Sequence, residues 1–383
     1  MRTFLALLAT AVLIAGEALP ATTFATWTGD PCTTLTVRVL AQTPPAAIRA
    51  RRAGGQWQAQ EVSVRQILDT GWSVAECTIA GLKPDEKVEF DDGAAPIGAW
   101  RTLRDRLDPP LRLAIGGDML HEQKYLDAVC AALAPADPEV AVIGGDWAYD
   151  NAETKNFARY HTLFSTWAAR MRRADGSGVP MIAGVGNHEL GKGRGKVPET
   201  PFGILFPEPM TRAVDIGAQV SFLLLNTNHG QAVAEQTAWL AQALAERKAR
   251  TWRFAVYHVP AYPSVRKFED GASPQVRKEW VPLFERGGVT VAFENHDHAL
   301  KRTHPLLDGK TDPAGVTYLG DGAWGVGERK PATPEERPYL VLSAAKRHAW
   351  IVAVGEKSLN ARAIGEGGIE LDQVELKPRP AAP

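Results

Sequence analysis

The sequence of 383 residues carries almost no excess of charge of either sign. It contains 43 Lys and Arg residues against 44 Asp and Glu residues, which gives a formal net charge of −1 at pH 7. A nearly neutral chain has no long-range field with which to collect nucleic acid or an anionic membrane. We therefore expect no nucleic-acid partner, and any affinity for a charged substrate must come from a local site.

Cysteine is also scarce. The 3 cysteines are Cys32, Cys77 and Cys130, and none stands in the CxxC spacing of a structural zinc site. Cys32 and Cys77 could pair in an oxidising compartment. Because a disulfide needs a short Cα separation, the sequence leaves that pairing open. Cys130 lies in a helical pattern, which predicts a small buried apolar residue.

No segment is apolar for long enough to cross a bilayer. A short apolar run at residues 5–14 follows the positive start at Arg2 and precedes small residues. This pattern is typical of a secretory signal peptide, which we assign to residues 1–21 with cleavage after Ala18. A buried N-terminal strand or a retained anchor is the alternative. The signal peptide predicts a secreted or periplasmic protein without a membrane span.

Short strands are the first structural pattern present. Within residues 22–106, polar and apolar residues alternate over 34–40 and less regularly over 72–79, as in half-buried strands. Several such strands separated by turns predict a small β-sandwich. The Gly-Leu-Lys-Pro turn at 81–84 and the closing Trp-Arg-Thr at 100–102 resemble those of fibronectin type III modules.

The pattern changes after Pro109 and Pro110, because two prolines cannot continue a central strand. Short apolar runs then alternate with helical stretches. Such runs predict βαβ units whose strands are buried on both faces. We assign residues 107–370 to this α/β domain and expect the proline-rich tail, residues 371–383, to be disordered.

Polar residues follow five of the predicted strands at the point where each ends. In chain order they are Asp118, Asp146 with Tyr149, Asn187 with His188, His258, and His296 with His298. Ligands of open α/β sheets gather at the carboxyl ends of strands. Taken singly, an Asp in such a place is more typical of a turn. Together, carboxylates and imidazoles predict a site for iron, zinc or manganese rather than calcium, which takes oxygen ligands.

The motifs around these residues resemble a known family. The series GGD, GGDWAY, GNHE, YHVP and NHDH resembles the five blocks of the calcineurin-like metallophosphoesterases. The tyrosine three residues after Asp146 narrows the resemblance to the purple acid phosphatase branch. The resemblance covers residues 111–302 and implies a four-layer α/β sandwich, two mixed β-sheets flanked by helices, which the small β-sandwich would precede.

The resemblance also implies two metal sites. Asp118, Tyr149 and His298 would hold Fe(III), and Asn187, His258 and His296 would hold a divalent ion (Zn, Fe or Mn). Asp146 would bridge them. Two cations held in this way clamp an in-line displacement at phosphorus and lower the pKa of the attacking water. His188, beside Asn187, would contact the phosphate and protonate the leaving oxygen; the alternative is that it only positions a ligand.

Three features depart from the family pattern. Asn295 stands where the last block usually has Gly, and Leu120 stands where the first block of many members has His. The extra histidines that some members carry beside the fourth block are absent from residues 259–262. Softer candidates for substrate contact, chosen by their closeness to strand ends, are Trp147, His229, Tyr262 and Arg302.

The leading hypothesis from the sequence is therefore a binuclear-metal hydrolase of phosphate esters, a phosphomonoesterase. A phosphodiesterase using the same metals is the close alternative, because specificity depends on loops that the motifs do not describe. A cell-surface binding protein with a degenerate metal site is a third. The presence of all seven metal-ligating side chains favours a hydrolase. The sequence does not predict an oligomeric state.

Overall fold

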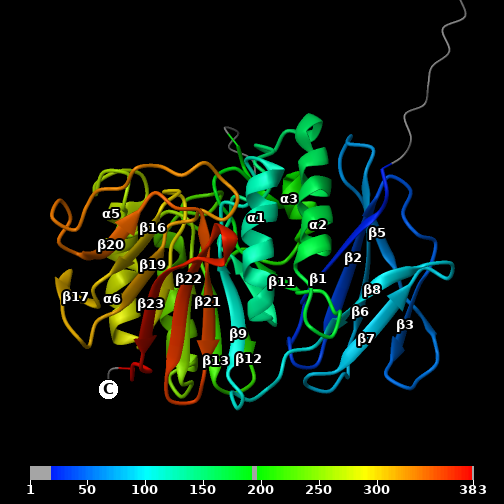
Figure 1. Ribbon diagram of the computed structural model, residues 1–383, viewed down its shortest axis with the longest axis horizontal. Coiled ribbons are helices and arrows are strands. Elements are labelled where there is room, and N and C mark those ends of the chain that lie inside the picture. Colours follow the sequence, from blue (N-terminus) through cyan, green and yellow to red (C-terminus); the bar gives the residue numbers. More distant parts are fainter. Residues whose placement is uncertain (1–18, 192–195, 382–383) are drawn as a thin grey trace, which may run out of the picture.

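The computed structural model describes residues 19–191 and 196–381. The N-terminal part consists of two four-stranded antiparallel sheets, ordered β1-β2-β6-β5 and β4-β3-β7-β8, seen at the right of Figure 1. Val37, Ile48 and Val88 belong to the core between them. The strands are β1 (Thr22–Thr26), β2 (Leu35–Ala41), β3 (Ile48–Arg52), β4 (Gln58–Gln60), β5 (Ser63–Gln66), β6 (Ser73–Ile79), β7 (Lys87–Asp91) and β8 (Pro96–Arg101).

Two mixed sheets form the rest of the fold. The first has six strands in the order β11-β10-β9-β21-β22-β23, and the second has seven in the order β12-β13-β14-β15-β19-β16-β20. The first comprises β9 (Leu111–Gly116), β10 (Val140–Ile143), β11 (Met181–Ala183), β21 (His348–Val354), β22 (Leu359–Gly365) and β23 (Glu370–Leu376). The second comprises β12 (Arg212–Ile216), β13 (Val220–Leu224), β14 (Trp252–Val256), β15 (Val291–Phe293), β16 (Leu300–Thr303), β19 (Thr317–Gly320) and β20 (Leu340–Ala344). A small ribbon, β17 (Leu306–Leu307) with β18 (Lys310–Thr311), lies outside both sheets.

The two mixed sheets share one hydrophobic core, because alternate residues of each strand point to opposite faces. Leu113 and Ile115 of β9 lie in the same core as Phe222 of β13, whereas Ala114 and Leu223 belong to the two outer clusters. Helices cover those outer faces (Figure 1). They are α1 (Gln123–Leu133), α2 (Ala158–Arg170) and α3 (Pro201–Leu205) beside the six-stranded sheet, and α4 (Thr237–Glu246), α5 (Ser273–Glu279) and α6 (Val281–Arg286) beside the seven-stranded sheet. The predicted four-layer α/β sandwich is confirmed.

Parallel strands lie at the centre of both mixed sheets. β9, β10 and β11 run parallel to one another, and so do β13, β14, β15 and β19. Their carboxyl ends, with the loops that follow them, therefore come to one edge of the sandwich, where ligands of such sheets bind.

The tail is not disordered over the residues that the structure describes, which corrects the expectation for 371–383. Residues 371–376 belong to β23, which pairs antiparallel with β22. Beyond the strand, Arg379 donates from Nη1 to the carbonyl of Val289 and from Nε to that of Ala314, both at 2.6 Å. The prolines, which lack a backbone N–H, do not prevent these two contacts, because the donor groups belong to the Arg379 side chain.

The three cysteines are free and buried. Burial raises the pKa of each thiol to about 12, so none is a reactive thiolate at neutral pH. The pairing of Cys32 with Cys77, which the sequence left open, is not present.

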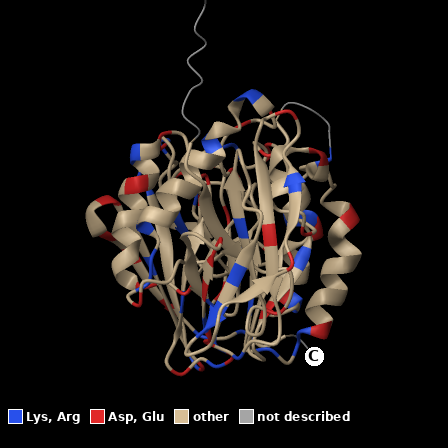
Figure 2. Cartoon of the chain, turned by 90° about the vertical axis from the view of Figure 1, so that its right-hand side faces the viewer, with Lys and Arg blue, Asp and Glu red and all other residues tan. Residues whose placement is uncertain are grey.

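The predicted signal peptide lies almost entirely in residues 1–18, outside the described residues, and stays a prediction. Within the described ranges, the helices are all too short or too polar to cross a bilayer. Figure 2 shows Lys and Arg interspersed with Asp and Glu over the chain, as the near-zero net charge implies.

Candidate metal centre

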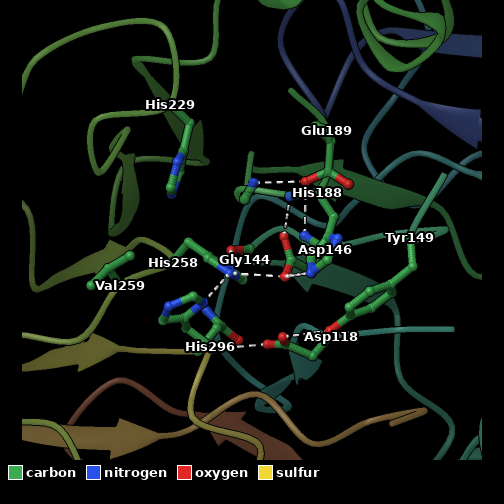
Figure 3. A network of polar contacts seen from close by, with 12 residues as sticks. Asp118, Gly144, Asp146, Tyr149, His188, Glu189, His229, His258, Val259 and His296 are labelled. Carbon is green, nitrogen blue, oxygen red and sulfur yellow. Dashed lines mark hydrogen bonds and ion pairs between the residues drawn. The ribbon is translucent and has the colours of Figure 1, made fainter. Parts of the chain in front are cut away.

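The predicted ligands converge from five loops, each of which follows a parallel strand of one of the two mixed sheets (Figure 3). Asp118 follows β9, Asp146 and Tyr149 follow β10, and Asn187 follows β11. From the other sheet, His258 follows β14, and His296 and His298 follow β15. Six of the seven side chains form two neighbouring groups of donor atoms, and Asn187 belongs to neither group.

The first group is Asp118, Tyr149 and His298. The Tyr149 hydroxyl donates to Oδ1 of Asp118 at 2.8 Å, and Nε2 of His298 lies 3.0 Å from the same carboxylate oxygen and 3.1 Å from the hydroxyl. All three side chains are buried, with Tyr149 the most exposed at 7%. Three donors of different types thus meet at one point.

The second group is Asp146, His258 and His296. Their ligand atoms all lie within 4.8 Å of one another. Oδ2 of Asp146 is 3.2 Å from Nε2 of His258, which is in turn 3.1 Å from Nδ1 of His296. The two groups adjoin, because the backbone N–H of His296 donates to Oδ2 of Asp118 at 2.9 Å.

These distances fit metal ligation. Donor atoms about 2.1 Å from a common ion and at right angles about it lie about 3 Å apart, close to the separations seen here. Two buried polar atoms of the predicted ligands also lack a hydrogen-bond partner among the described residues, Oδ1 of Asn187 and Nδ1 of His298. Such orphans are rare in folded proteins, and a bound cation would satisfy the first of them. The mixture of carboxylate, phenol, amide and imidazole suits iron, zinc or manganese.

The backbone is unusual at the same residues. Asp118, Asp146, Tyr149, His296 and His298 all have positive φ, between 54° and 79°. L-residues other than Asn, Asp and Gly seldom adopt this conformation, which costs free energy and persists where the surrounding fold imposes it. Tyr149, His296 and His298 are therefore aimed by strained backbone.

The charges at the centre are strongly coupled. Burial alone would raise the pKa of Asp118 and Asp146, but the imidazole of His258 faces both and holds the pKa of each carboxyl below its ordinary value. For His258, burial acts to lower the pKa, and the two carboxylates overcome it and raise the pKa to about 9. The buried carboxylates thus make the centre a site for positive charge.

Glu189 was missed as a functional residue, although it belongs to the GNHE motif. Its buried carboxylate accepts backbone N–H groups from Asp146 at 2.8 Å, Trp147 at 2.8 Å and Gly186 at 2.7 Å. It therefore ties the loop after β10 to the loop after β11. Gly186 is required beside it, because a Cβ there would lie 2.2 Å from Oδ1 of Asp146. The sequence signal that could have identified Glu189 is an acidic residue directly after His188 in the GNHE motif.

His188, the predicted catalytic residue, lies half-buried at the edge of the centre. Its Nδ1 donates to Oδ1 of Asn151 at 2.5 Å, and its Nε2 lies 3.8 Å from Oδ2 of Asp146. Asn151, which the sequence analysis did not single out, thus fixes the ring so that Nε2 faces the carboxylate.

His121 is a second functional residue that the sequence analysis did not single out. Its ring packs edge-on against Tyr149, with centroids 4.3 Å apart, and against His298 at 5.3 Å. His188 packs on Tyr149 as well, at 4.2 Å. The Tyr149 ring is therefore flanked by two histidines. No sequence pattern indicates this, since it depends on side-chain packing between separate loops.

Three of the four softer substrate candidates are corrected. Trp147 is fully buried and donates from Nε1 to the carbonyl of Gly184 at 3.0 Å. Tyr262 is 3% exposed and packs on Tyr318, with centroids 4.6 Å apart. Arg302 points away from Lys301, its buried neighbour in β16, and forms an ion pair with Asp372 of β23 at 2.7 Å. Closeness in sequence to a strand end does not decide on which side a residue lies.

His229 is the candidate that lies next to the centre. Its ring is 5.7 Å from that of His258, at an angle of 72°, and it stands above His258 in Figure 3. Burial, followed by the charge of His258, lowers the pKa of His229 to about 3. It therefore faces the centre as a neutral imidazole.

The chain was compared with known proteins by its sequence and by its fold. No family profile matches the chain. Purple acid phosphatase 21 of Arabidopsis thaliana is 24% identical over 262 residues, 64% of this chain and 57% of that protein. Purple acid phosphatase 15 of the same plant is 23% identical over 289 residues, 64% of this chain and 52% of that protein. The chain thus spans about half the length of the curated relatives it matches.

Among solved structures, the purple acid phosphatase PPD1 from yellow lupin (Lupinus luteus) seeds matches with a TM-score of 0.74, covering 94% of this chain and 74% of that chain at 14% identity. PhoD matches with a TM-score of 0.64, covering 93% and 88% at 13% identity. At such low identity these likenesses show a shared fold. The chain is similar to purple acid phosphatases in sequence and in fold.

In this purple acid phosphatase-like chain, the departure at Asn295 has a structural explanation. The Asn295 side chain donates from Nδ2 to the carbonyl of Tyr257 at 2.8 Å and lies over two glycines of the first and second motifs. A Cβ on Gly117 would lie 2.6 Å from Oδ1 of Asn295, and one on Gly144 would lie 2.0 Å from its Nδ2. The paired glycines of GGD and GGDWAY therefore make room for Asn295.

Proposed function

We propose that this chain hydrolyses phosphate esters with the help of two metal ions, as a phosphomonoesterase. Asp118, Tyr149 and His298 would hold one ion, Asn187, His258 and His296 the other, and Asp146 would bridge them. The observation that carries the proposal is the meeting of two adjacent groups of donor atoms, within each of which neighbouring donors lie about 3 Å apart. The buried amide oxygen of Asn187, which has no hydrogen-bond partner among the described residues, supports it. The resemblance to purple acid phosphatases supports it.

The two ions would supply an activated water and neutralise charge on the phosphoryl oxygens. The remaining work falls to the chain. Glu189 and the strained loops hold the carboxylates in fixed positions, so that no reorganisation is needed as charge develops. His188 presents Nε2 toward the centre because Asn151 engages its other nitrogen. It is therefore the group we assign to proton transfer to the leaving oxygen. Because Nδ1 keeps its proton for Asn151, this role requires the imidazolium form, in which Nε2 also carries a proton.

We further propose Fe(III) for the first site and Zn, Fe or Mn for the second. The phenol oxygen of Tyr149 beside the carboxylate of Asp118 supports a hard, highly charged cation at the first site. A secreted or periplasmic location is part of the same proposal, and it rests on the sequence of residues 1–21.

Paired chromogenic substrates test the function. With the metal-loaded enzyme we expect rapid release of p-nitrophenol from p-nitrophenyl phosphate and slower release from bis(p-nitrophenyl) phosphate. Asp146→Asn weakens the bridge between the ions, and we expect it to lower kcat by roughly 10²- to 10³-fold. Half-exposed Asp127, which pairs with Arg170, offers the matched control Asp127→Asn. Faster hydrolysis of the diester would favour a phosphodiesterase, and no hydrolysis of either would contradict the proposal.

A further inference from the structure

A cavity of about 590 Å³ lies beside the loop that carries His229. His229 forms part of its wall and also lies 5.7 Å, centroid to centroid, from the His258 ring. Much of the wall is apolar, and it includes Val197, Pro198, Phe206, Pro209, Met210 and Trp239. Clefts with apolar walls and a few convergent polar groups are typical of small-molecule sites.

The loop that carries His229 is held firmly. The backbone N–H of His229 donates to Oδ1 of Asn226 at 2.6 Å, and Nδ2 of Asn226 donates back to the carbonyl of His229 at 2.7 Å. The Gln236 side chain in turn donates to the carbonyl of Asn226 at 2.6 Å and accepts its N–H at 2.9 Å. The imidazole is therefore presented from a fixed turn.

The hydrogen bonds also indicate which nitrogen of His229 carries the proton. Oγ1 of Thr227 accepts the backbone N–H of Val259 at 3.0 Å and lies 3.1 Å from Nε2 of His229. Among the described residues, that nitrogen is the acceptor available to the Thr227 hydroxyl proton. Nε2 therefore accepts and the neutral ring bears its proton on Nδ1. Nδ1 has no partner in the described part of the chain, so it is free to donate.

The two flanks of the centre differ in polarity. On one flank lie His188, Asn151 and His121, which are polar. On the other flank, His229 leads to the apolar cavity. Two charged side chains line that wall, Lys196 and Glu208, and Glu208 is already paired with Arg38 at 2.5 Å. The rest of the wall is mainly apolar. An uncharged organic group fits this cavity better than a second phosphate.

We propose that the cavity beyond His229 receives the organic group of the phosphoester, that its walls select an aryl or other bulky apolar group, and that His229 donates from Nδ1 to a phosphoryl oxygen at the entrance. This inference rests on the proposed function and names its substrate class. His229 is then a substrate-contacting residue, supplied from the loop after β13, and Trp239 is a specificity-determining one.

Binding of two non-hydrolysable probes tests the cavity without relying on turnover. Phenylphosphonate and methylphosphonate carry the same anionic head and differ in the organic group. By calorimetry with the metal-loaded protein we expect phenylphosphonate to bind roughly tenfold more tightly, because only its ring buries apolar surface. Equal affinities for the two probes would overturn the assignment of the cavity.

Three variants separate the two parts of the inference. Trp239→Ala should weaken phenylphosphonate by roughly tenfold and leave methylphosphonate unchanged, since it removes one aromatic wall. His229→Ala should weaken both probes by a similar factor, roughly fivefold to tenfold, since it removes a donor to the shared head. His229→Asn should restore that affinity, because the amide nitrogen of Asn occupies nearly the position of Nδ1.

Trp57→Ala is the matched control, because Trp57 is a half-buried tryptophan of the N-terminal sheets beneath Arg51; it should change neither affinity. If Trp239→Ala affects both probes equally, the cavity does not hold the organic group. If His229→Asn binds as weakly as His229→Ala, Nδ1 makes no such contact. If the wild type hydrolyses p-nitrophenyl phosphate, either of these negative results would leave the proposed function intact. If the wild type neither hydrolyses that substrate nor binds either phosphonate, both the proposed function and the assignment of the cavity are overturned.

Discussion

Nδ2 of Asn295 occupies the position that a side chain on Gly144 would need, 2.0 Å from where its Cβ would lie. The three nearest atoms to that Cβ all belong to Asn295, and Gly144 has an ordinary negative φ. A side chain at position 144 would therefore clash with that of Asn295, although 151 positions separate the two residues in the sequence.

This relationship predicts a specific compensation. Gly144→Ala should lower the free energy of unfolding by about 1–3 kcal/mol, the usual cost of overpacking a core. In an Asn295→Gly background the same substitution should cost less than about 0.5 kcal/mol, because the three atoms nearest to the new Cβ are gone. Urea unfolding of the four proteins gives the coupling free energy. Gly327→Ala, at a position with nothing within 4 Å, is the control. Additive effects of Gly144→Ala and Asn295→Gly would contradict the account.

Tyr149 is expected to determine the colour of the enzyme. If its phenol oxygen ligates Fe(III) beside Asp118, the iron-loaded wild type has a tyrosinate-to-iron absorption band in the visible range, and Tyr149→Phe lacks it. The control is Tyr125→Phe, which removes a hydroxyl on α1, remote from the ligand loops. A colourless wild-type enzyme with full activity would indicate another metal pair.

His188 is expected to act on the leaving group. His188→Ala should reduce kcat for phenyl phosphate by roughly 10²- to 10⁴-fold, and much less for p-nitrophenyl phosphate, because p-nitrophenolate departs without a proton. Asn151→Ala, which frees Nδ1 of the ring, should show a weaker version of the same selectivity. An equal loss with both substrates would mean that His188 positions a ligand and does not protonate the leaving oxygen.

His348 is expected to make the fold sensitive to acid. It is fully buried with Nε2 3.1 Å from the carbonyl of Gly320, and burial lowers its pKa from 6.5 to about 4. Between these values the unfolded chain binds a proton that the folded chain does not, so stability falls as the pH falls from about 6.5 toward 4. The loss attributable to this group is about 3 kcal/mol at pH 4.

Comparison with His348→Gln isolates the contribution of His348 from that of other acidic groups. Gln does not titrate, so the stability advantage of the wild type at pH 7 should shrink by about that amount at pH 4. Urea unfolding at the two pH values measures it. A constant difference across the range would show that His348 does not titrate in this way.

The sequence was sufficient to predict that the polar side chains of Asp118, Asp146 and His258 come together, because each follows a strand that is recognisable locally. A short apolar run that ends in GGD or GNHE marks a strand and its carboxyl end, and parallel strands bring such ends to one edge. For that reason the sequence alone predicted that Asp118 and Asn187 lie at the same edge of the sheet. The four-layer arrangement followed from the same alternation of strands and helices.

What escaped prediction depends on contacts between distant segments. The tail is ordered because the Arg379 side chain donates hydrogen bonds to the carbonyl groups of Val289 and Ala314. No local sequence pattern predicts these contacts. Trp147 is buried because Phe206, beyond α3, packs on it with centroids 4.8 Å apart. The role of His121 follows from the packing of its ring on Tyr149.

The most direct test of the central claim is the metal content of the purified chain, measured per polypeptide by mass spectrometry of the elements. The account predicts two ions per chain, one of them iron. It also predicts that Asp118→Asn, which removes a donor from the first group only, retains about one ion. A wild-type protein that binds no iron, zinc or manganese would contradict the account and favour a binding protein with a degenerate site.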